Sequence, residues 1–254
     1  TLCIGCLQCE AACREVNRLP SPAFPPRPRS PQPVHRRPDA TAFTVVNTVA
    51  GAPTRGADET RTVTHVKVQC MHCLDAACVS SCIVGALRVN GTGAVVYDAD
   101  RCIGCRYCLI ACPFEIPAYE YADPVEPRVR KCTFCADGGG GTDAVPACAR
   151  VCPVEAIVYG RRADLIELAE ARLQASPDRY LPHVYGRTEA GGTSWLVLAG
   201  QPFSNLGLPD LPGESPARLT EAIQHGVFRW GAAPAALFGA LATLMWWRSK
   251  KREP

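Results

Sequence analysis

The sequence has little of what marks a nucleotide-dependent enzyme or a nucleic-acid-binding protein. Phe, Trp and Tyr make up 7% of its 254 residues and 23 prolines interrupt it, so we expect a loop-rich body. Lysine and arginine exceed the acidic residues by three, yet outside the extreme C-terminus they form no run resembling a phosphate track. The sequence also offers no glycine-rich nucleotide loop and no acid/base pair, which argues against catalysis by this chain alone.

A secretory leader is also absent. The chain opens with Thr1, two residues before its first cysteine. Because threonine is an implausible natural start, we expect a leader to precede this sequence in the full protein.

Sixteen cysteines stand out against this background. They fall into four groups of four, each group ends in C-x3-C, and none is left over. Group one is Cys3, Cys6, Cys9 and Cys13; group two is Cys70, Cys73, Cys78 and Cys82; group three is Cys102, Cys105, Cys108 and Cys112; and group four is Cys132, Cys135, Cys148 and Cys152. Proline follows the last cysteine of groups three and four.

This spacing is typical of iron–sulfur ligation. Three thiolates on a tight turn bind three irons of a [4Fe–4S] cluster, and the fourth ligand comes from elsewhere in the chain. Structural zinc would use C-x2-C pairs without the further cysteines and proline, and disulfides would not produce such regular tetrads. We therefore predict four [4Fe–4S] clusters, with a zinc-bound structural protein as the alternative of a different class. Each cluster with its thiolates adds a charge of about −2, so the formal charge of +3 becomes about −5 and does not indicate nucleic-acid binding.

The ligands are predicted to be exchanged between groups. In two-cluster ferredoxins the fourth cysteine of each run binds the other cluster. Groups two and three are close in sequence and should exchange in this way, which leaves groups one and four as the other pair. The predicted sets are Cys3, Cys6, Cys9 and Cys152 (cluster a); Cys13, Cys132, Cys135 and Cys148 (cluster b); Cys70, Cys73, Cys78 and Cys112 (cluster c); and Cys82, Cys102, Cys105 and Cys108 (cluster d).

The segments between the groups predict an α+β fold of two fused bacterial-ferredoxin-like dicluster modules with long loops. Residues 1–19 and 126–160 form one module, and residues 70–125 form the other. We expect a β-hairpin from residues 86–89 and 94–97, and a matching strand at 156–159.

Two segments lie outside the modules. Residues 20–69 form a proline-rich insertion with a strand pair at 41–49 and 61–68, and this insertion either docks a partner or serves as padding. Residues 161–226 form a helix and an extended C-terminal wrap. The packing face of that helix is predicted to hold Leu165, Ile166, Leu168, Ala169 and Leu173.

Several residues beside the cysteines could influence the clusters without binding them. Gly5 and Gly104 lie inside ligand turns, where backbone N–H groups approach sulfur or the turn itself needs glycine. His72 stands between two cysteines, but four cysteines per cluster already suffice. Charges flanking the turns either raise a cluster's potential or are ordinary solvated surface charges; they are Arg101, Arg106, Lys131 and Arg150.

Residues 227–254 predict a transmembrane anchor with a basic tail. The eighteen residues Trp230 to Trp247 carry no charge and would span about 27 Å as a helix. Arg248, Lys250, Lys251 and Arg252 follow, which favours a cytoplasmic C-terminus with the clusters on the opposite side. A buried core helix is the alternative. A stripe of small residues is predicted to face a membrane partner; it consists of Gly231, Ala235, Gly239 and Thr243.

With these motifs in place, the sequence resembles the iron–sulfur subunit of the periplasm-facing, quinone-coupled Hyb-type [NiFe] hydrogenase. That family belongs to the wider group of four-cluster ferredoxin-like subunits of molybdopterin oxidoreductases. The matching stretches are residues 1–6, 69–73, 105–108, 183–186, 189–192, 202–209 and 223–225 and the terminal helix. One departure is Ile83, which stands where the family usually has proline and relaxes the turn at Cys82; Arg14 likewise follows group one.

The resemblance implies an electron relay of four clusters with groups one and four, and two and three, paired. Its implied partners are the small and large subunits of a [NiFe] hydrogenase, a multispanning quinone-reacting subunit and the lipid bilayer, without nucleic acid. It also implies export of the folded protein on a twin-arginine leader to the periplasmic side of a bacterial inner membrane. The same role in a formate dehydrogenase or another molybdopterin oxidoreductase is the alternative, although residues 185–189 and 191–193 favour hydrogenase.

Overall fold

The computed structural model describes residues 2–20, 35–51, 63–121, 123, 126, 128–136 and 145–250. For residues 219–220, 223–225, 227–230 and 249–250 only the backbone is described. The elements in chain order are α1 (Gln8–Val16), β1 (Thr44–Ala50), β2 (Val63–Gln69), α2 (Ala77–Ser80), β3 (Leu87–Val89), β4 (Val95–Tyr97), η1 (Ala99–Arg101), α3 (Tyr107–Ala111), β5 (Ala118–Tyr119), β6 (Val129–Arg130), α4 (Ala147–Arg150), α5 (Arg162–Ala175), η2 (Glu189–Gly191), η3 (Phe203–Leu206) and α6 (Ala217–Lys250).

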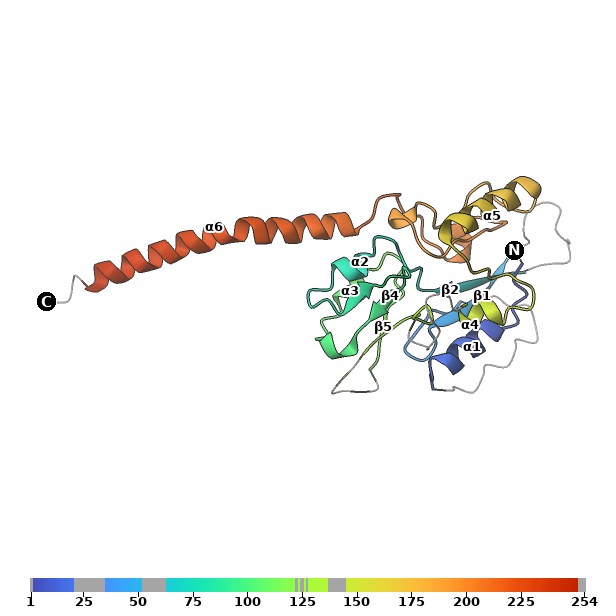
Figure 1. Ribbon diagram of the computed structural model, residues 1–254, viewed down its shortest axis with the longest axis horizontal. Helices are drawn as coiled ribbons and strands as arrows, with labels where there is room; N and C mark the ends of the chain where they lie inside the picture. Colours follow the sequence, from blue (N-terminus) through green and yellow to red (C-terminus); the bar gives the residue numbers. More distant parts are fainter. Residues whose placement is uncertain are drawn as a thin grey trace.

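Short helices carry the cysteine groups, and they pack in two pairs. Helix α1 holds Cys9 and Cys13 and packs against α4, which holds Cys148. Helix α2 holds Cys78 and packs against α3, which holds Cys108. Figure 1 shows the two pairs side by side in the body of the molecule, with β1 and β2 beside the first pair. The mixed α+β content is therefore confirmed, and the helices bring group one to group four and group two to group three.

The described strands form three two-stranded antiparallel sheets. Strands β1 and β2 pair with Val46 opposite Lys67 and Thr48 opposite His65, which confirms the strand pair predicted in the insertion. Strands β3 and β4 pair with Leu87 opposite Tyr97, which confirms the predicted hairpin. Val46 of β1 and Val95 of β4 are buried because they pack on cysteines of the helix pairs, Val46 on Cys9 and Cys148 and Val95 beside Cys78 and Cys108.

The strand predicted at residues 156–159 is wrong. No strand of the described chain hydrogen-bonds to this segment, so it has no ladder to join. Instead, the Ala156 N–H donates to Cys152 Sγ at 3.3 Å, and Ile157 packs on Cys9, Val46 and Cys148. The apolar pattern therefore reflects packing beside cysteines rather than sheet formation.

Helix α5 confirms the predicted helix over residues 163–175, but its packing face is confirmed only in part. Ala169 is buried, whereas Leu168 is 39% exposed. The proline-rich stretch from residue 21 to residue 34 lies outside the described residues, as does the turn at 52–62. No structural outcome can be assigned to the predictions that fall there.

Helix α6 extends away from the body at the end where α2 and α3 lie (Figure 1). Its start is fixed to group two, because Ser215 Oγ donates to Asp75 O at 2.9 Å and α6 contacts α2. Among the residues that the structure describes, no helix has both the length and the apolarity that crossing a bilayer requires. The predicted transmembrane span at residues 230–247 is therefore not supported. Lys251 and Arg252 of the predicted basic tail lie outside the described residues.

Candidate metal centres

Each cysteine group begins with a turn that includes a residue in the left-handed region. This residue directly precedes the second cysteine of its group, and the four are Gly5 (φ 67°), His72 (φ 47°), Gly104 (φ 71°) and Phe134 (φ 58°). Glycine is needed at two of these turns for space as well. A Cβ on Gly5 would lie 2.6 Å from the His65 ring, and one on Gly104 would lie 2.6 Å from Tyr119 Oη. The same local turn therefore recurs in all four groups.

Backbone N–H groups point at cysteine sulfur in all four groups; in group one a backbone hydrogen bond from Gly5 opposes the burial that raises the pKa of Cys3. The donors to Cys82, Cys102, Cys132 and Cys152 are the N–H groups of Ala86, Gly104, Phe134 and Ala156, with N···S distances of 3.2, 3.4, 3.4 and 3.3 Å. Such N–H···S bonds stabilise a thiolate and, in an iron–sulfur centre, the more negative reduced state. The expectation that Gly104 brings its N–H to sulfur is confirmed.

Burial disfavours ionisation of most of these thiols in the free protein. It raises the pKa of Cys9 to about 12, that of Cys132 to about 12 and that of Cys108 to about 11. Burial, followed by neighbouring thiols, raises the pKa of Cys13, Cys73 and Cys78 further. A buried thiol of this kind loses its proton only when a metal ion binds to the sulfur and replaces the proton. The donor set is chemically suited to iron.

The thiols that influence one another come from more than one group. After burial, Cys152 and Cys6 act on the pKa of Cys3, and Cys132, Cys135 and Cys148 act on that of Cys13. Cys70 and Cys112 act on the pKa of both Cys73 and Cys78, while Cys102, Cys82 and Cys105 act on that of Cys108. Cysteines far apart in sequence thus lie together across the helix pairs. The assignment of each thiol to one cluster stays a prediction.

Side-chain packing joins the four groups into one row. Cys9 and Cys148 pack together with Val46, Cys70 and Cys132 pack with Ile116, and Cys78 and Cys108 pack in one apolar core with Leu87. Across the described ranges, no three His, Cys, Asp or Glu side chains converge tightly enough to hold a single metal ion. A [4Fe–4S] cluster takes one thiolate on each of four irons, so its ligands surround it and need not converge on a point.

Two lysines lie among the cysteines. Lys131 is 4% exposed, and its Nζ donates to the carbonyl oxygens of Val95 and of Cys132, the latter at 3.1 Å. Lys67 donates to Gln69 Oε1 at 2.9 Å and lies 4.4 Å from the centroid of the Trp195 ring. No carboxylate in the described part of the chain forms an ion pair with either lysine. Each charge lowers the pKa of nearby thiols, Lys67 that of Cys9 and Lys131 that of Cys78, so both would favour an anionic cluster.

The predicted arginines have different surroundings. Arg101 is mostly exposed and pairs with Asp98 at 3.3 Å. Arg106 lies over the rings of Tyr119 and Tyr121, with distances of 4.3 and 5.2 Å to their centroids. Arg150 is exposed and lowers the pKa of Cys135 only weakly compared with burial. Of the four predicted charges, Lys131 alone is buried.

A polar link that sequence reasoning missed joins group one to group four. Asn17 ends α1, and its Nδ2 donates to Cys13 O at 2.8 Å. Thr133 Oγ1 donates to Asn17 Oδ1 at 3.0 Å, and the Cys135 N–H donates to Thr133 Oγ1 at 3.2 Å. Because Asn17 and Thr133 are 116 residues apart, no local pattern indicates this contact.

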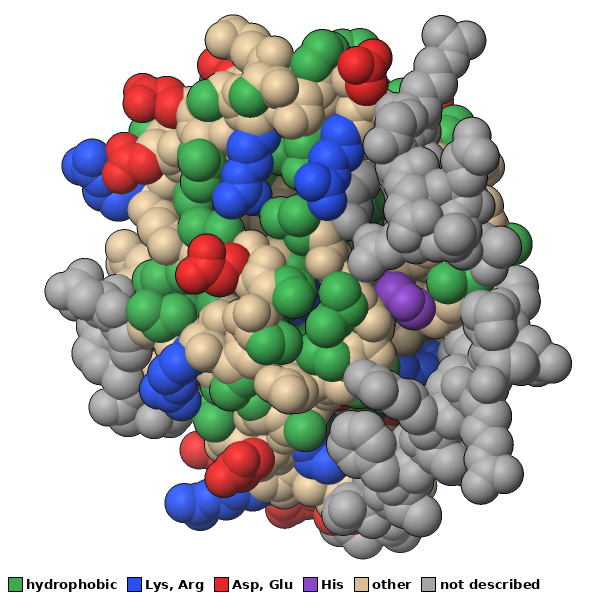
Figure 2. Space-filling view, turned by 90° about the vertical axis from the view of Figure 1, so that its right-hand side faces the viewer, with side chains coloured by type: hydrophobic (Ala, Val, Ile, Leu, Met, Phe, Trp, Pro, Cys, Tyr) green, Lys and Arg blue, Asp and Glu red, His purple; other side chains and the backbone are tan. Residues whose placement is uncertain are grey.

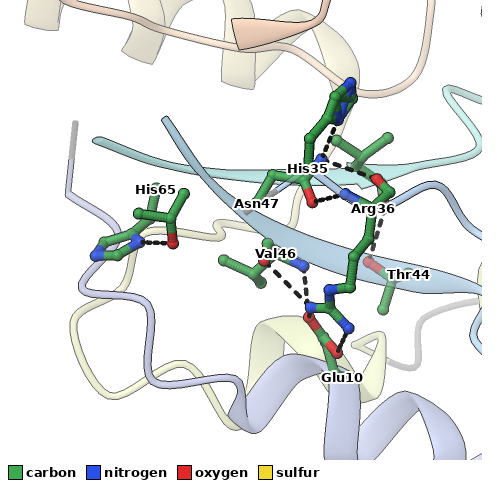
Figure 3. Close-up of polar contacts among 9 residues, drawn as sticks. Glu10, His35, Arg36, Thr44, Val46, Asn47 and His65 are labelled. Atoms are coloured by element: carbon green, nitrogen blue, oxygen red, sulfur yellow. Dashed lines mark hydrogen bonds and ion pairs between the residues drawn. The ribbon is translucent and has the colours of Figure 1, made fainter. Parts of the chain in front are cut away.

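The segment that precedes β1 is fixed to α1 by a buried ion pair (Figure 3). Glu10 is 4% exposed, and its Oε2 accepts from Arg36 Nη1 at 3.1 Å while its Oε1 pairs with Arg36 Nη2. The Val46 N–H donates to Glu10 Oε1 at 2.5 Å. Asn47 accepts from the Arg36 N–H at 2.7 Å and donates to Arg36 O at 2.9 Å. Strand β1, the segment around Arg36 that precedes it and the helix that carries Cys9 and Cys13 are thereby held together.

An apolar hollow lies beside group one, at the end of the molecule opposite α6. Its volume is about 210 Å³. Figure 2 views this end and shows hydrophobic side chains gathered at its centre, with charged side chains around them. The described lining includes Ile4, Leu7, Leu168, Leu196 and Leu198. Exposed Leu168 of α5 thus borders a surface hollow.

The stripe predicted to face a membrane partner lies on α6. A Cβ added at Gly231 or Gly239 would meet no atom within 4 Å. Thr243 Oγ1 donates to the Gly239 and Ala240 carbonyls at 2.8 and 2.9 Å, so its hydroxyl is satisfied within the helix. The stripe, completed by Ala235, is open in this chain, and its role as a partner face stays a prediction.

Comparisons with known proteins agree with this chemistry. Models of the 4Fe–4S dicluster domain match residues 62–162 and 2–86. The chain is 44% identical over 248 residues to a protein of Nitratidesulfovibrio vulgaris, covering 95% of this chain and 64% of the relative. It is 35% identical over 279 residues to the hydrogenase-2 operon protein HybA of Escherichia coli O157:H7, covering 96% of this chain and 81% of the relative.

A further relative is the iron–sulfur subunit of the nitrate-inducible formate dehydrogenase of Escherichia coli K12. It is 36% identical over 182 residues, which is 68% of this chain and 58% of the relative. Two dicluster domains correspond to four [4Fe–4S] clusters, the number that the sixteen cysteines predict. The cofactor prediction is confirmed, and the zinc alternative is set aside.

Proposed function

We propose that this chain, which belongs to the HybA-like family of 4Fe–4S dicluster proteins, relays electrons from a [NiFe] hydrogenase to a membrane quinone-reacting subunit. It is an iron–sulfur electron-transfer subunit of an oxidoreductase complex and not a catalyst alone. The finer assignment names the hydrogenase small subunit as electron donor and a multispanning subunit as acceptor, with the cluster domain on the periplasmic side. The similarity to HybA along 96% of this chain supports it.

The row of cysteine groups is the observation that carries the relay. Packing runs from group one to group four, then to group two and then to group three. We assign the clusters in this order as a, b, c and d, with the ligand sets predicted from the spacing. The thiols that influence one another's pKa across the helix pairs support these sets. Electrons entering at one end would then leave at the other.

The protein's part in the relay is electrostatic and protective. Each [4Fe–4S] cluster, when bound, accepts and returns one electron. The buried inner thiols keep water away from the middle of the row, and backbone N–H groups at Ala86, Gly104, Phe134 and Ala156 offset negative charge on sulfur. Lys67 and Lys131 add positive charge next to clusters a, b and c. These groups favour the reduced state of the centres they contact.

A formate dehydrogenase is the second candidate for the catalytic partner. The formate dehydrogenase-O iron–sulfur subunit of Escherichia coli K12 is 29% identical over 96% of this chain. The hydrogenase-2 operon protein is 35% identical over the same share, which favours hydrogenase. Both candidates use the same row of clusters and differ only in the protein that docks on it.

Co-purification from native membranes tests the assignment. A tagged full-length chain should bring down the small and large subunits of a [NiFe] hydrogenase together with a multispanning subunit. A strain lacking the chain should lose hydrogen-dependent quinone reduction and keep formate-dependent reduction, and the wild-type gene should restore it, whereas Cys70→Ser should not. Recovery of a formate dehydrogenase, with loss of the formate-dependent reaction instead, would replace the proposed partner. Protease accessibility in spheroplasts checks the periplasmic placement.

A further inference from the structure

In the row of cysteine groups, groups one and three are the outer groups, and groups four and two are the inner groups. The residue at the left-handed turn position differs between outer and inner groups. Groups one and three have glycine there, at Gly5 and Gly104, as the positive φ angle favours. Groups two and four have His72 and Phe134 instead, two residues with large side chains. Those side chains meet, with ring centroids 4.7 Å apart. His72 and Phe134 thus adopt a positive φ angle, which is unfavourable for residues with large side chains, at the place where the two inner groups face each other.

His72 is the more unusual of the two because it is polar and fully buried. Its exposed fraction is 0%. The Val95 N–H donates to His72 Nδ1 at 3.0 Å, so Nδ1 is an acceptor and carries no hydrogen. A neutral imidazole has one N–H, and it must therefore be on Nε2. Strand β4 fixes both the orientation and the tautomer of the ring.

The Nε2–H of His72 has no hydrogen-bond acceptor among the described protein atoms. A buried donor left without an acceptor is strongly disfavoured, so native proteins almost always provide one. His72 lies directly between Cys70 and Cys73, and its ring contacts Phe134, which lies between Cys132 and Cys135. The acceptor that the chemistry of this place supplies is a sulfur atom of an inner cluster.

We propose that His72 Nε2–H donates a hydrogen bond to a sulfur of an inner [4Fe–4S] cluster and thereby raises the reduction potential of that cluster. His72 acts as a positioning residue, since it binds no iron. A hydrogen bond to cluster sulfur favours the reduced state, because reduction adds negative charge to the acceptor. The inference deepens the proposed relay but does not depend on which enzyme supplies the electrons.

Two substitutions separate the functions of the two ring nitrogens. Asparagine at position 72 can place its oxygen near the position of Nδ1 and still accept from Val95, but it offers no donor where Nε2 lies. Glutamine can place its amide near the position of Nε2 and still donate. Asparagine also tolerates a positive φ angle better than most residues. His72→Asn therefore removes the proposed bond with little strain, and His72→Gln retains it.

The test is an anaerobic redox titration of the full-length complex, followed by electron paramagnetic resonance. In His72→Asn one of the four potentials should fall by about 59 mV, a tenfold change in the ratio of reduced to oxidised cluster, and the other three should not move. His72→Gln should stay near the wild type, as should the control His183→Asn, since the His183 side chain is 48% exposed and pairs with Glu189. Four unchanged potentials in His72→Asn, with iron content retained, would overturn the proposal.

A second readout covers the case in which His72→Asn loses iron. Wild-type protein with ¹⁵N-labelled histidine should show a nitrogen hyperfine coupling to a reduced cluster in pulsed resonance spectra. The coupling should persist in His183→Asn and disappear in His72→Gln, which separates His72 from His65 beside group one; a coupling that persists in His72→Gln would contradict the proposal. If the wild type shows no such coupling, His72 does not contact a cluster and the inference is wrong. This result says nothing against the hydrogenase assignment, which co-purification tests separately.

Discussion

Removing Arg36 should loosen α1 more than neutralising Glu10 does, although both changes break the same ion pair. Arg36→Met leaves the Glu10 carboxylate, which is 4% exposed, with the Val46 N–H as its remaining described donor. Glu10→Gln leaves the Arg36 guanidinium without its carboxylate, but that side chain is 30% exposed and can be hydrated. The glutamine oxygen can still accept from Val46. The two variants therefore differ in which charge is left without a partner.

The expected loss of stability in each variant follows from how deeply the remaining charge is buried. Breaking a buried pair by removing one partner costs about 3–5 kcal/mol. Because Arg36 is partly exposed, we expect about 2–3 kcal/mol for Arg36→Met and about 1 kcal/mol for Glu10→Gln. A difference of about 1–2 kcal/mol corresponds to roughly 5- to 30-fold in the equilibrium for local opening. The double variant should lie close to Glu10→Gln, since neither charge is then left alone.

Hydrogen exchange of α1 in the cluster-loaded protein measures this opening under anaerobic conditions. Amides of residues 8–16 should exchange fastest in Arg36→Met, and amides of β3 and β4 should be unchanged. Iron release to a chelator should follow the same order, because α1 carries Cys9 and Cys13. If Glu10→Gln opens α1 as readily as Arg36→Met, the buried carboxylate is not what makes the pair matter, and the reasoning fails.

Three further predictions concern single sites. Gly104→Ala should destabilise the protein by about 2 kcal/mol or more in thermal unfolding, because the new Cβ would lie 2.6 Å from Tyr119 Oη. The control Gly85→Ala, at φ 64° with no atom within 4 Å of the new Cβ, should destabilise it by only about 1 kcal/mol. Equal losses of stability in the two variants would refute the clash with Tyr119. Cys112→Ser should perturb the cluster that uses the first three cysteines of group two and spare the one on the first three of group three; resonance spectra showing the reverse would refute ligand exchange. Burial raises the pKa of Glu189, but hydrogen bonds from His183 and backbone N–H groups lower it more, so the net shift of the pKa is downward. The ionised carboxylate therefore stabilises the folded protein above its unfolded pKa of about 4.3. This stabilisation is lost as pH falls through the lower pKa of the folded protein. Glu189→Gln should accordingly melt below the wild type at about pH 5, and this margin should shrink as pH falls below about 4.3; a margin that stays constant down to about pH 3 would contradict the linkage.

Sequence alone predicted the parts of this molecule that are encoded locally. The spacing within each cysteine group, the hairpin at residues 86–89 and 94–97 and the helix from residue 163 all depend on neighbours a few residues away. The segment at 156–159 has the apolar residues of a strand, yet a strand also needs a partner with free N–H and C=O groups. That requirement is set by the fold and cannot be read from the segment.

Contacts between distant segments account for what the sequence did not indicate. Lys67 looks like an ordinary solvent-facing residue of a strand, and only the packing of β2 beside the helices puts its charge near Cys9 and Cys13. The hydrogen bond from Thr133 to Asn17 connects residues that no local pattern relates.

The hydrogen bond between Thr133 in group four and Asn17 after group one sets an order in which the helix pairs can form during synthesis. Asn17 and Thr133 are 116 residues apart, a distance that a bacterial ribosome covers in roughly 6 to 23 s. During that interval the thiols of group one have no partner helix, while groups two and three are complete by Cys112. The middle of the nascent chain can therefore take up its metal centres first, and the first four cysteines need protection from oxidation until α4 emerges. A chain interrupted after residue 125 would still contain both helices of the α2–α3 pair but would leave the N-terminal thiols without α4, which packs on them.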